Sequence, residues 1–151
     1  IGIEVHRPGV GACLMDADEA GITNLRIFEH DAVEVLADCI PNESLTTLQL
    51  FFPDPWHKSR HHKRRLIQKP FLALLARLLK PGGVVCIATD WQPYAEHIAE
   101  VVAESPQFQS KNFEEIPAIQ SLKRPMTKFE KKGIEAGREI HNFYLVSVAD
   151  K

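Results

Sequence analysis

Alternating strand and helix patterns are the feature of this sequence that most constrains its fold. Short apolar runs that predict strands are each followed by a segment with apolar residues at the spacing of a helix face. We expect strands at Ile1–Val5, Leu25–Phe28, Leu45–Phe52 and Val84–Thr89, and helices over about 10–17, 32–39, 67–78 and 93–104. This order is typical of parallel strands joined by right-handed crossovers. The sequence therefore predicts an α/β fold with a mostly parallel sheet and helices on both faces.

The end of the chain departs from this alternation. Phe108–Phe113 and Phe143–Val148 both look like strands, with a polar stretch between them, so we expect a strand pair there and an antiparallel strand at the C-terminal end. With 151 residues and 44% hydrophobic content, the chain can bury one core. We therefore expect a single domain over 1–151.

Composition argues against several classes of protein. Apolar runs such as Gly83–Thr89 are too short to cross a bilayer, and no charged-then-apolar leader opens the chain. The three cysteines are an odd number without metal-type spacing, which argues against a disulfide framework. We expect a soluble, cytoplasmic protein with no metal site. Because the net charge is −2, any contact with nucleic acid must be local.

Acidic residues lie at the end of each expected strand or just beyond it. They are Glu4, Asp31, Asp54 and Asp90. Since parallel strands end at one edge of a sheet, these carboxylates are expected to line one rim, where they suit the ribose of an adenosine-containing cofactor. Ordinary loop acids are the alternative. Gly9-Val10-Gly11 imitates a dinucleotide-binding fingerprint only in part, because Leu14 occupies the third glycine position.

The segment Phe52-Pro53-Asp54-Pro55-Trp56 is the most informative stretch. Prolines on both sides stiffen the backbone and hold the Asp54 carboxylate on a rigid turn. Trp56 can serve as a platform for a nucleic-acid base, although it can also simply cap the sheet edge. We interpret the segment as part of an active site that acts on RNA.

A basic run follows that segment directly. Residues 57–65 carry five fixed positive charges and three histidines. Phosphates are the natural partner of such a run. We predict RNA contacts from Arg60, His61, His62, Lys63, Arg64 and Arg65. A solvated loop is the common alternative, whereas a metal site of His57, His61 and His62 is disfavoured because the adjacent cations would repel a metal ion.

Together these motifs resemble a known family. The segments that carry the resemblance are Glu4-Val5-His6, His30-Asp31-Ala32, Phe52–Lys58, Arg64-Arg65, Ala88-Thr89-Asp90-Trp91 and Thr127-Lys128-Phe129-Glu130. In this order they are similar to the bacterial tRNA (guanine-N7)-methyltransferases nearly end to end. The resemblance implies a Rossmann-like class I methyltransferase fold. It also implies transfer of a methyl group from S-adenosylmethionine to N7 of a guanosine in the variable loop of tRNA.

The resemblance implies roles for individual residues. Glu4 and Asp31 match cofactor-binding acids, and Asp54 matches a catalytic acid that is also a cofactor-binding position. The substrate-binding positions match Lys58, Asp90, Thr127, Lys128, Phe129 and Glu130. Because guanine N7 carries a lone pair and no proton, the reaction needs positioning and a fixed carboxylate near the base rather than a general base.

One departure from the family concerns its glycine-rich loop, which follows the first strand and cradles the methionine part of the cofactor. We expect that strand and loop upstream of Ile1, and we expect these 151 residues alone to bind the cofactor poorly and to be inactive or unstable. Two other functions stay open: a non-catalytic RNA-binding module and a methyltransferase acting on another base, such as an amine target. The protein can be a monomer or a homodimer.

Overall fold

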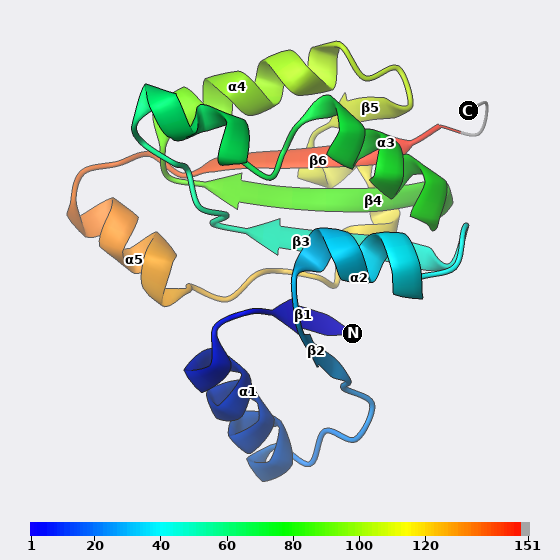
Figure 1. Ribbon diagram of the computed structural model, residues 1–151, viewed down its shortest axis with the longest axis vertical. Coiled ribbons are helices and arrows are strands. Elements are labelled where there is room, and N and C mark those ends of the chain that lie inside the picture. Colours follow the sequence, from blue (N-terminus) through cyan, green and yellow to red (C-terminus); the bar gives the residue numbers. More distant parts are fainter. Residues whose placement is uncertain (149–151) are drawn as a thin grey trace. The chain divides into compact units, whose positions relative to one another are not determined.

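The computed structural model describes residues 1–148, which fall into two compact units. The first is Ile1–Pro41, and the second begins at Asn42. Among the described residues, strands pair only within a unit, in sheets of order β1-β2 and β3-β4-β6-β5 (Figure 1). The single domain expected over 1–151 stays a prediction.

The first unit contains two strand–helix pairs, as the sequence predicted. Its elements are β1 (Gly2–Glu4), α1 (Arg7–Glu19), β2 (Ile27–Glu29) and α2 (Ala32–Cys39). The two strands are parallel, and their register places Glu4 opposite Glu29. Helix α1 begins at a local cap, because the Nδ1 atom of His6 accepts a hydrogen bond from the Gly9 N–H at 3.2 Å. Both strands of this unit therefore end with a carboxylate.

The second unit is built on a four-stranded mixed sheet. Its strands are β3 (Leu45–Phe51), β4 (Leu79–Thr89), β5 (Phe108–Lys111) and β6 (His141–Ser147). Strands β3 and β4 are parallel, whereas β6 is antiparallel to both β4 and β5. The predicted strand pair at the end of the chain and its antiparallel strand are therefore confirmed. Strand β6 lies between the two strands that precede it in sequence.

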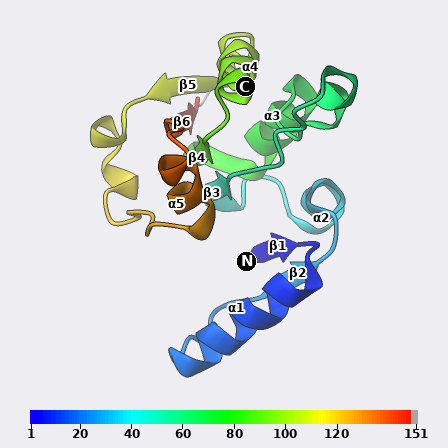
Figure 2. The same ribbon diagram turned by 90° about the vertical axis from the view of Figure 1, so that its left-hand side faces the viewer.

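Two helices cover one face of this sheet. They are α3 (Lys69–Leu78) and α4 (Gln92–Ala103), which lie on the same side in Figure 2. Apolar side chains at helical spacing, such as Leu72 and Leu75 of α3, are fully buried. Each such side chain contributes roughly 1.5–3 kcal/mol by leaving water. The loops that leave the carboxyl ends of β3 and β4 therefore lead into helices that are anchored on the sheet.

The opposite face is covered differently. Two 3₁₀ turns, η2 (Phe113–Glu115) and η3 (Pro117–Ile119), follow β5 on the other side of the sheet (Figure 2). Ile116 and Ile119 pack here against Val84 and Cys86 of β4. Burial raises the pKa of the Cys86 thiol, so this cysteine acts as a small apolar core residue. Helices were predicted on both faces of the sheet. In the described part of this unit, α-helices cover one face, and the 3₁₀ turns η2 and η3 cover the other.

Two elements differ from the expectation. Strand β4 begins at Leu79, before the glycines that were expected to precede the strand, and its pairing with β3 is irregular between Leu45 and Thr47. The polar stretch between the last two expected strands, for which no helix was predicted, contains α5 (Lys128–Glu135).

No helix within residues 1–148 is long and apolar enough to span a bilayer.

Candidate active site

The Asp54 turn leaves β3 between two residues with strained backbone. Phe52 and Trp56 have φ angles of 53° and 46°, in the left-handed region that aromatic residues rarely occupy. Such positions cost about 1–3 kcal/mol each. Between them, the Oδ1 atom of Asp54 accepts a hydrogen bond from the Trp56 N–H at 3.0 Å. The turn is thus held in one conformation with an exposed carboxylate at its tip.

Contacts from both sides of the turn hold it against this strain. The Phe52 N–H donates to the carbonyl of Ala88 on β4 at 2.7 Å. On the other side, the Nε atom of Arg65 donates to the carbonyl of Pro55 at 2.7 Å. These two bonds anchor the entrance and the exit of the turn, so the rigidity predicted from its prolines has a tertiary origin as well.

Arg65 corrects one expectation. It was predicted as a surface cation for RNA, but it is only 4% exposed, and its guanidinium lies over the ring of Tyr94 at 5.0 Å. The Oη atom of Tyr94 in turn accepts a hydrogen bond from the Ile67 N–H at 3.2 Å. Arg65 supports the Asp54 turn from the buried side, through its hydrogen bond to Pro55, and its guanidinium is not exposed for contact with a phosphate.

The rest of the basic run forms an open loop around Trp56. Residues Ser59–Arg64 form a 3₁₀ turn, η1. Arg64 lies over the Trp56 ring at 5.2 Å, and the His61 ring lies 5.7 Å from it. Lys58, Arg60, Lys63 and Arg64 are exposed, and His61 and His62 are half-buried. No group of three or more His, Cys, Asp or Glu residues comes together as a metal site within residues 1–148.

Asp90 follows β4 and faces helix α5. Its Oδ2 atom accepts a hydrogen bond from the Nε atom of Arg138 at 2.8 Å. A methyl group added to Gly133 of α5 would lie 2.9 Å from the Asp90 side chain, closer than real contacts allow. The glycine is therefore required for α5 to approach this acid.

The predicted substrate segment forms the start of α5. The Oγ1 atom of Thr127 accepts the Glu130 N–H at 3.0 Å, which begins the helix. The Phe129 ring is exposed and stacks on Phe52 at 6.5 Å. Lys128 is exposed. The structure thus brings the Thr127–Glu130 segment next to the entrance of the Asp54 turn.

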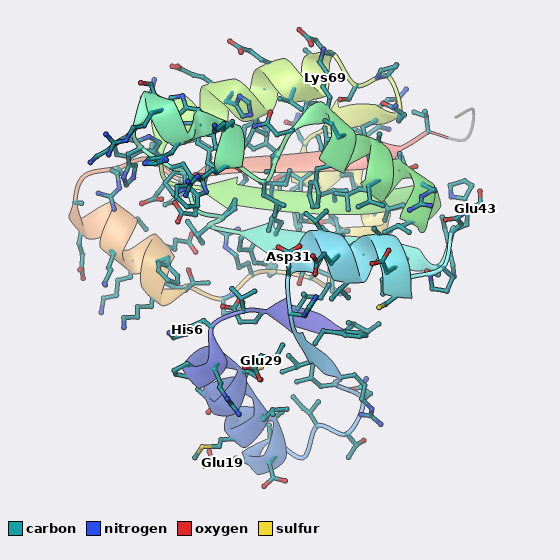
Figure 3. The ribbon with its side chains drawn as sticks, in the orientation of Figure 1. His6, Glu19, Glu29, Asp31, Glu43 and Lys69 are labelled. Atoms are coloured by element: carbon teal, nitrogen blue, oxygen red, sulfur yellow. The ribbon has the colours of Figure 1, made fainter. Side chains whose placement is uncertain are left out.

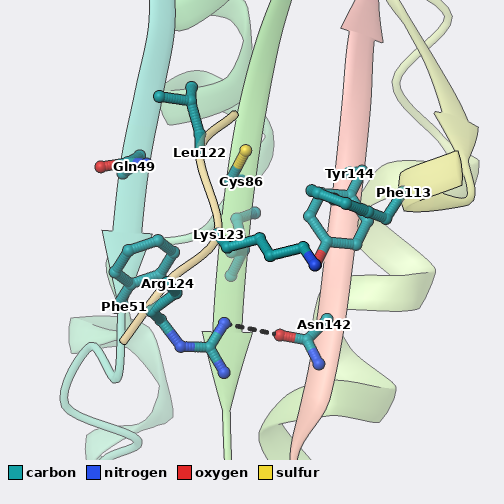
Figure 4. Close-up of a pocket in the computed structure, with 10 residues that line it drawn as sticks. Gln49, Phe51, Cys86, Phe113, Leu122, Lys123, Arg124, Asn142 and Tyr144 are labelled. Carbon is teal, nitrogen blue, oxygen red and sulfur yellow. Dashed lines mark hydrogen bonds between the residues drawn. The ribbon is translucent and has the colours of Figure 1, made fainter. Parts of the chain in front are cut away.

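A hollow of about 270 Å³ lies on the sheet face beside this segment. Figure 4 shows Phe51, Tyr144 and Phe113 around it, with Arg124 directed toward Asn142. The Tyr144 hydroxyl is a neutral hydrogen-bonding group at neutral pH, and burial raises its pKa further above the ordinary value. The hollow therefore offers aromatic surface together with neutral and cationic hydrogen-bond donors.

Of the three predicted cofactor-binding acids, Asp54 lies in the second unit, whereas Glu4 and Asp31 lie in the first. Glu4 ends β1, and its Oε1 atom accepts the His6 N–H at 3.1 Å. Asp31 lies at the start of α2 (Figure 3), where its Oδ2 atom accepts the Glu34 N–H at 3.0 Å. Each carboxylate therefore has one oxygen in a local hydrogen bond. Sequence reasoning did not single out Glu29, which ends β2 and pairs with Arg7 at 3.7 Å.

Comparison with known proteins decides the family. A family model described as "Putative methyltransferase" matches residues 1–143. The chain belongs to this methyltransferase family. Its fold agrees, since a methyltransferase homolog from Pyrococcus horikoshii is similar over 97% of this chain and 52% of that one, with a TM-score of 0.61 and 12% identity. An rRNA methylase from Streptococcus thermophilus is similar over 97% and 71%, with a TM-score of 0.59 and 12% identity.

Curated relatives match much more closely in sequence. A tRNA (guanine-N(7)-)-methyltransferase of Pseudoalteromonas translucida is 64% identical over 93% of this chain. One of Pseudoalteromonas atlantica is 53% identical over 99% of it. The chain spans 58% and 62% of the length of these two relatives. The resemblance read from the motifs, and the class I methyltransferase fold that it implied, are confirmed.

Proposed function

We propose that this chain is the larger part of an enzyme that transfers the methyl group of S-adenosylmethionine to N7 of a guanosine in tRNA, at the variable loop. The observation that carries the proposal is the rigid, exposed Asp54 turn joined directly to a loop of exposed cations. That arrangement occurs in a chain whose curated relatives are named for this reaction.

The first unit would bind the cofactor, which supplies an electrophilic methyl group on its sulfonium. Glu4 and Asp31 suit its adenosine part, because each carboxylate uses one oxygen locally and keeps other lone pairs for hydroxyl and amine donors. The chemistry of this donor set fits a nucleoside. These two acids, together with Asp54 of the second unit, carry the cofactor-binding role in the proposal.

The second unit would hold the base. The cofactor held by Glu4, Asp31 and Asp54 would supply the methyl group to the N7 lone pair of guanine, which would leave S-adenosylhomocysteine and a cationic 7-methylguanosine. No proton has to be removed from N7. Asp54 would face the positive charge that develops on the purine, and its fixed position means that little reorganisation is needed during the reaction.

The exposed loop would hold the RNA backbone. Lys58, Arg60, Lys63 and Arg64 present fixed charges, with His61 and His62 beside them. Asp90 and the Thr127–Glu130 segment would contact the target nucleotide, since both lie at the carboxyl ends of β3 and β4 with the Asp54 turn. Binding and chemistry are thus assigned to neighbouring segments of one unit.

The test uses this chain joined to the part of the P. translucida relative that lies outside the match, which we call the extended protein. It is incubated with labelled S-adenosylmethionine and an unmodified tRNA transcript, and the nucleosides are separated. Label is expected in 7-methylguanosine alone. The variant Asp54→Asn keeps the size of the side chain and is expected to lower kcat by roughly 100-fold or more.

Other outcomes separate the alternatives. Label in an exocyclic amine would show an amino-methyltransferase. RNA binding with no label in any nucleoside would show a binding module. Full activity in Asp54→Asn would remove Asp54 from the catalytic role and leave the reaction itself intact.

A further inference from the structure

Two arginine–carboxylate pairs are formed by the segments that flank helix α5. Arg124 binds Glu130, and Arg138 binds Asp90. Both acids are among the residues assigned to the target nucleotide, whereas neither arginine has been assigned a role. Each pair therefore holds an acid whose position matters for the proposed reaction.

The Arg124–Glu130 pair is bidentate. The Nη2 atom of Arg124 donates to Oε1 of Glu130 at 2.8 Å, and its Nε atom donates to Oε2 at 3.2 Å. The two side chains are only 13% and 14% exposed. Two parallel hydrogen bonds to one carboxylate fix its plane as well as its distance. The carboxylate of Glu130 therefore has a defined orientation relative to Arg124.

Arg124 also ties this carboxylate to the sheet. Its Nη1 atom donates to Oδ1 of Asn142 on β6 at 2.9 Å, the bond drawn in Figure 4. Its guanidinium lies 5.2 Å from the Phe51 ring centre and 5.8 Å from that of Phe52. Since Phe52 opens the Asp54 turn, one side chain links Glu130 with β3, β6 and that turn.

The second pair holds the other acid. Arg138, which follows α5, donates from Nε to Oδ2 of Asp90 at 2.8 Å. Gly133 packs on the same carboxylate from the helix side. Asp90 is thus held between Arg138 and the backbone of α5.

We propose that Arg124 and Arg138 are positioning residues that hold Glu130 and Asp90 in the orientation that guanine requires. This inference rests on the proposed function. A carboxylate has about four lone-pair sites, so a bidentate arginine leaves two that can accept N–H donors of a base, such as guanine N1–H and its amine. A base misplaced by about 1 Å loses rate by roughly 100-fold.

The experiment measures 7-methylguanosine formation by the extended protein and its Arg124 variants. Arg124→Gln is expected to lower kcat by roughly 10- to 100-fold, with the Kd for tRNA and for S-adenosylmethionine changed less than about threefold. Arg124→Lys keeps the charge but lacks the fork, so it is expected to restore only part of kcat. Arg138→Gln is expected to act in the same direction. Arg77→Gln, an exposed arginine of α3, is the matched control and leaves kcat unchanged.

The double variant Arg124→Gln/Glu130→Gln distinguishes positioning from a general loss of stability. If Arg124 acts through Glu130, the double variant has the kcat of Glu130→Gln alone. Multiplicative losses, or full kcat in Arg124→Gln, overturn the inference while 7-methylguanosine formation by the unaltered protein still supports the proposed function. No 7-methylguanosine from the unaltered protein refutes both.

Discussion

Arg64 is exposed and Arg65 is buried, although they are neighbours in sequence. Substituting each in turn therefore separates a surface cation of the basic run from one that supports the Asp54 turn. Arg65→Ala is expected to lower the free energy of unfolding by about 3 kcal/mol, because it removes a charged hydrogen bond and a buried cation–π contact. Arg64→Ala is expected to cost less than about 1 kcal/mol, since Arg64 is exposed. Urea unfolding of both variants, made in the extended protein, measures the two changes in the free energy of unfolding. Equal stability of the two would show that Arg65 does not support the turn.

Tyr94 gives a pH-dependent test of the layer beneath the turn. Burial raises the pKa of Tyr94 above its ordinary value of 10.0, and this effect outweighs the opposing effects of the Ile67 N–H and the Arg65 charge. Above about pH 10, the unfolded chain loses this proton while the folded chain keeps it. The stabilisation is therefore complete below pH 10 and is lost as pH rises through the folded pKa.

The variant Tyr94→Phe isolates that effect. At pH 7 it is expected to be less stable by about 1–2 kcal/mol, because the Ile67 N–H loses its acceptor. Between pH 9 and about pH 11, the difference from the unaltered protein should shrink. Unfolding midpoints measured across this range check it, and a difference that stays constant would show that the hydroxyl does not ionise on unfolding.

At the scale of elements, the basic loop predicts a defined salt dependence. With Arg65 buried, four exposed fixed charges remain, so the loop's contribution to the log–log slope of tRNA binding is at most about −3 to −4. Arg60→Ala/Lys63→Ala is expected to make the slope shallower by about 1.5–2, with kcat at saturating tRNA unchanged. The matched control is Arg77→Ala/Lys80→Ala, which removes two exposed charges elsewhere. An unchanged slope in the loop variant would remove the loop from RNA binding.

The sequence predicted elements well wherever the signal was local. Strands and helices up to α4 follow from apolar spacing, and the position of Asp54 follows from its prolines. Helix α5 was not predicted, although Thr127 followed by Glu130 is a pattern typical of a helix start. Its eight residues include a glycine and only two large apolar side chains, Phe129 and Ile134, which are too few to show the apolar spacing of a helix face.

The missed residues at the site depend on distant contacts. Arg138 meets Asp90 across 48 positions of sequence, and the burial of Arg65 depends on Tyr94 of another helix. No local pattern distinguishes these arginines from those exposed on the basic loop. Acids at strand ends could therefore be predicted, but the cations that orient them could not.

At the scale of the whole molecule, the strand edges predict how cofactor binding depends on the rest of the protein. Among the described residues, β1 pairs only with β2, and β3 pairs only with β4, so each has one edge without a partner strand. Unpaired edges leave backbone groups unsatisfied, and they invite pairing with another strand. We propose that the strand and glycine-rich loop implied by the family resemblance pair with such an edge and add donors for the methionine part of the cofactor.

We therefore expect the 151-residue chain to bind S-adenosylmethionine at least about 100-fold more weakly than the extended protein, a difference of roughly 2.7 kcal/mol. Isothermal titration of both proteins measures it, and Glu4→Gln in the extended protein provides the control for site identity. The Glu4→Gln variant should lose affinity because the ribose hydroxyls lose a charged acceptor. If the chain alone binds as tightly as the extended protein, Glu4 and Asp31 suffice for the cofactor, and the glycine-rich loop is not needed for affinity.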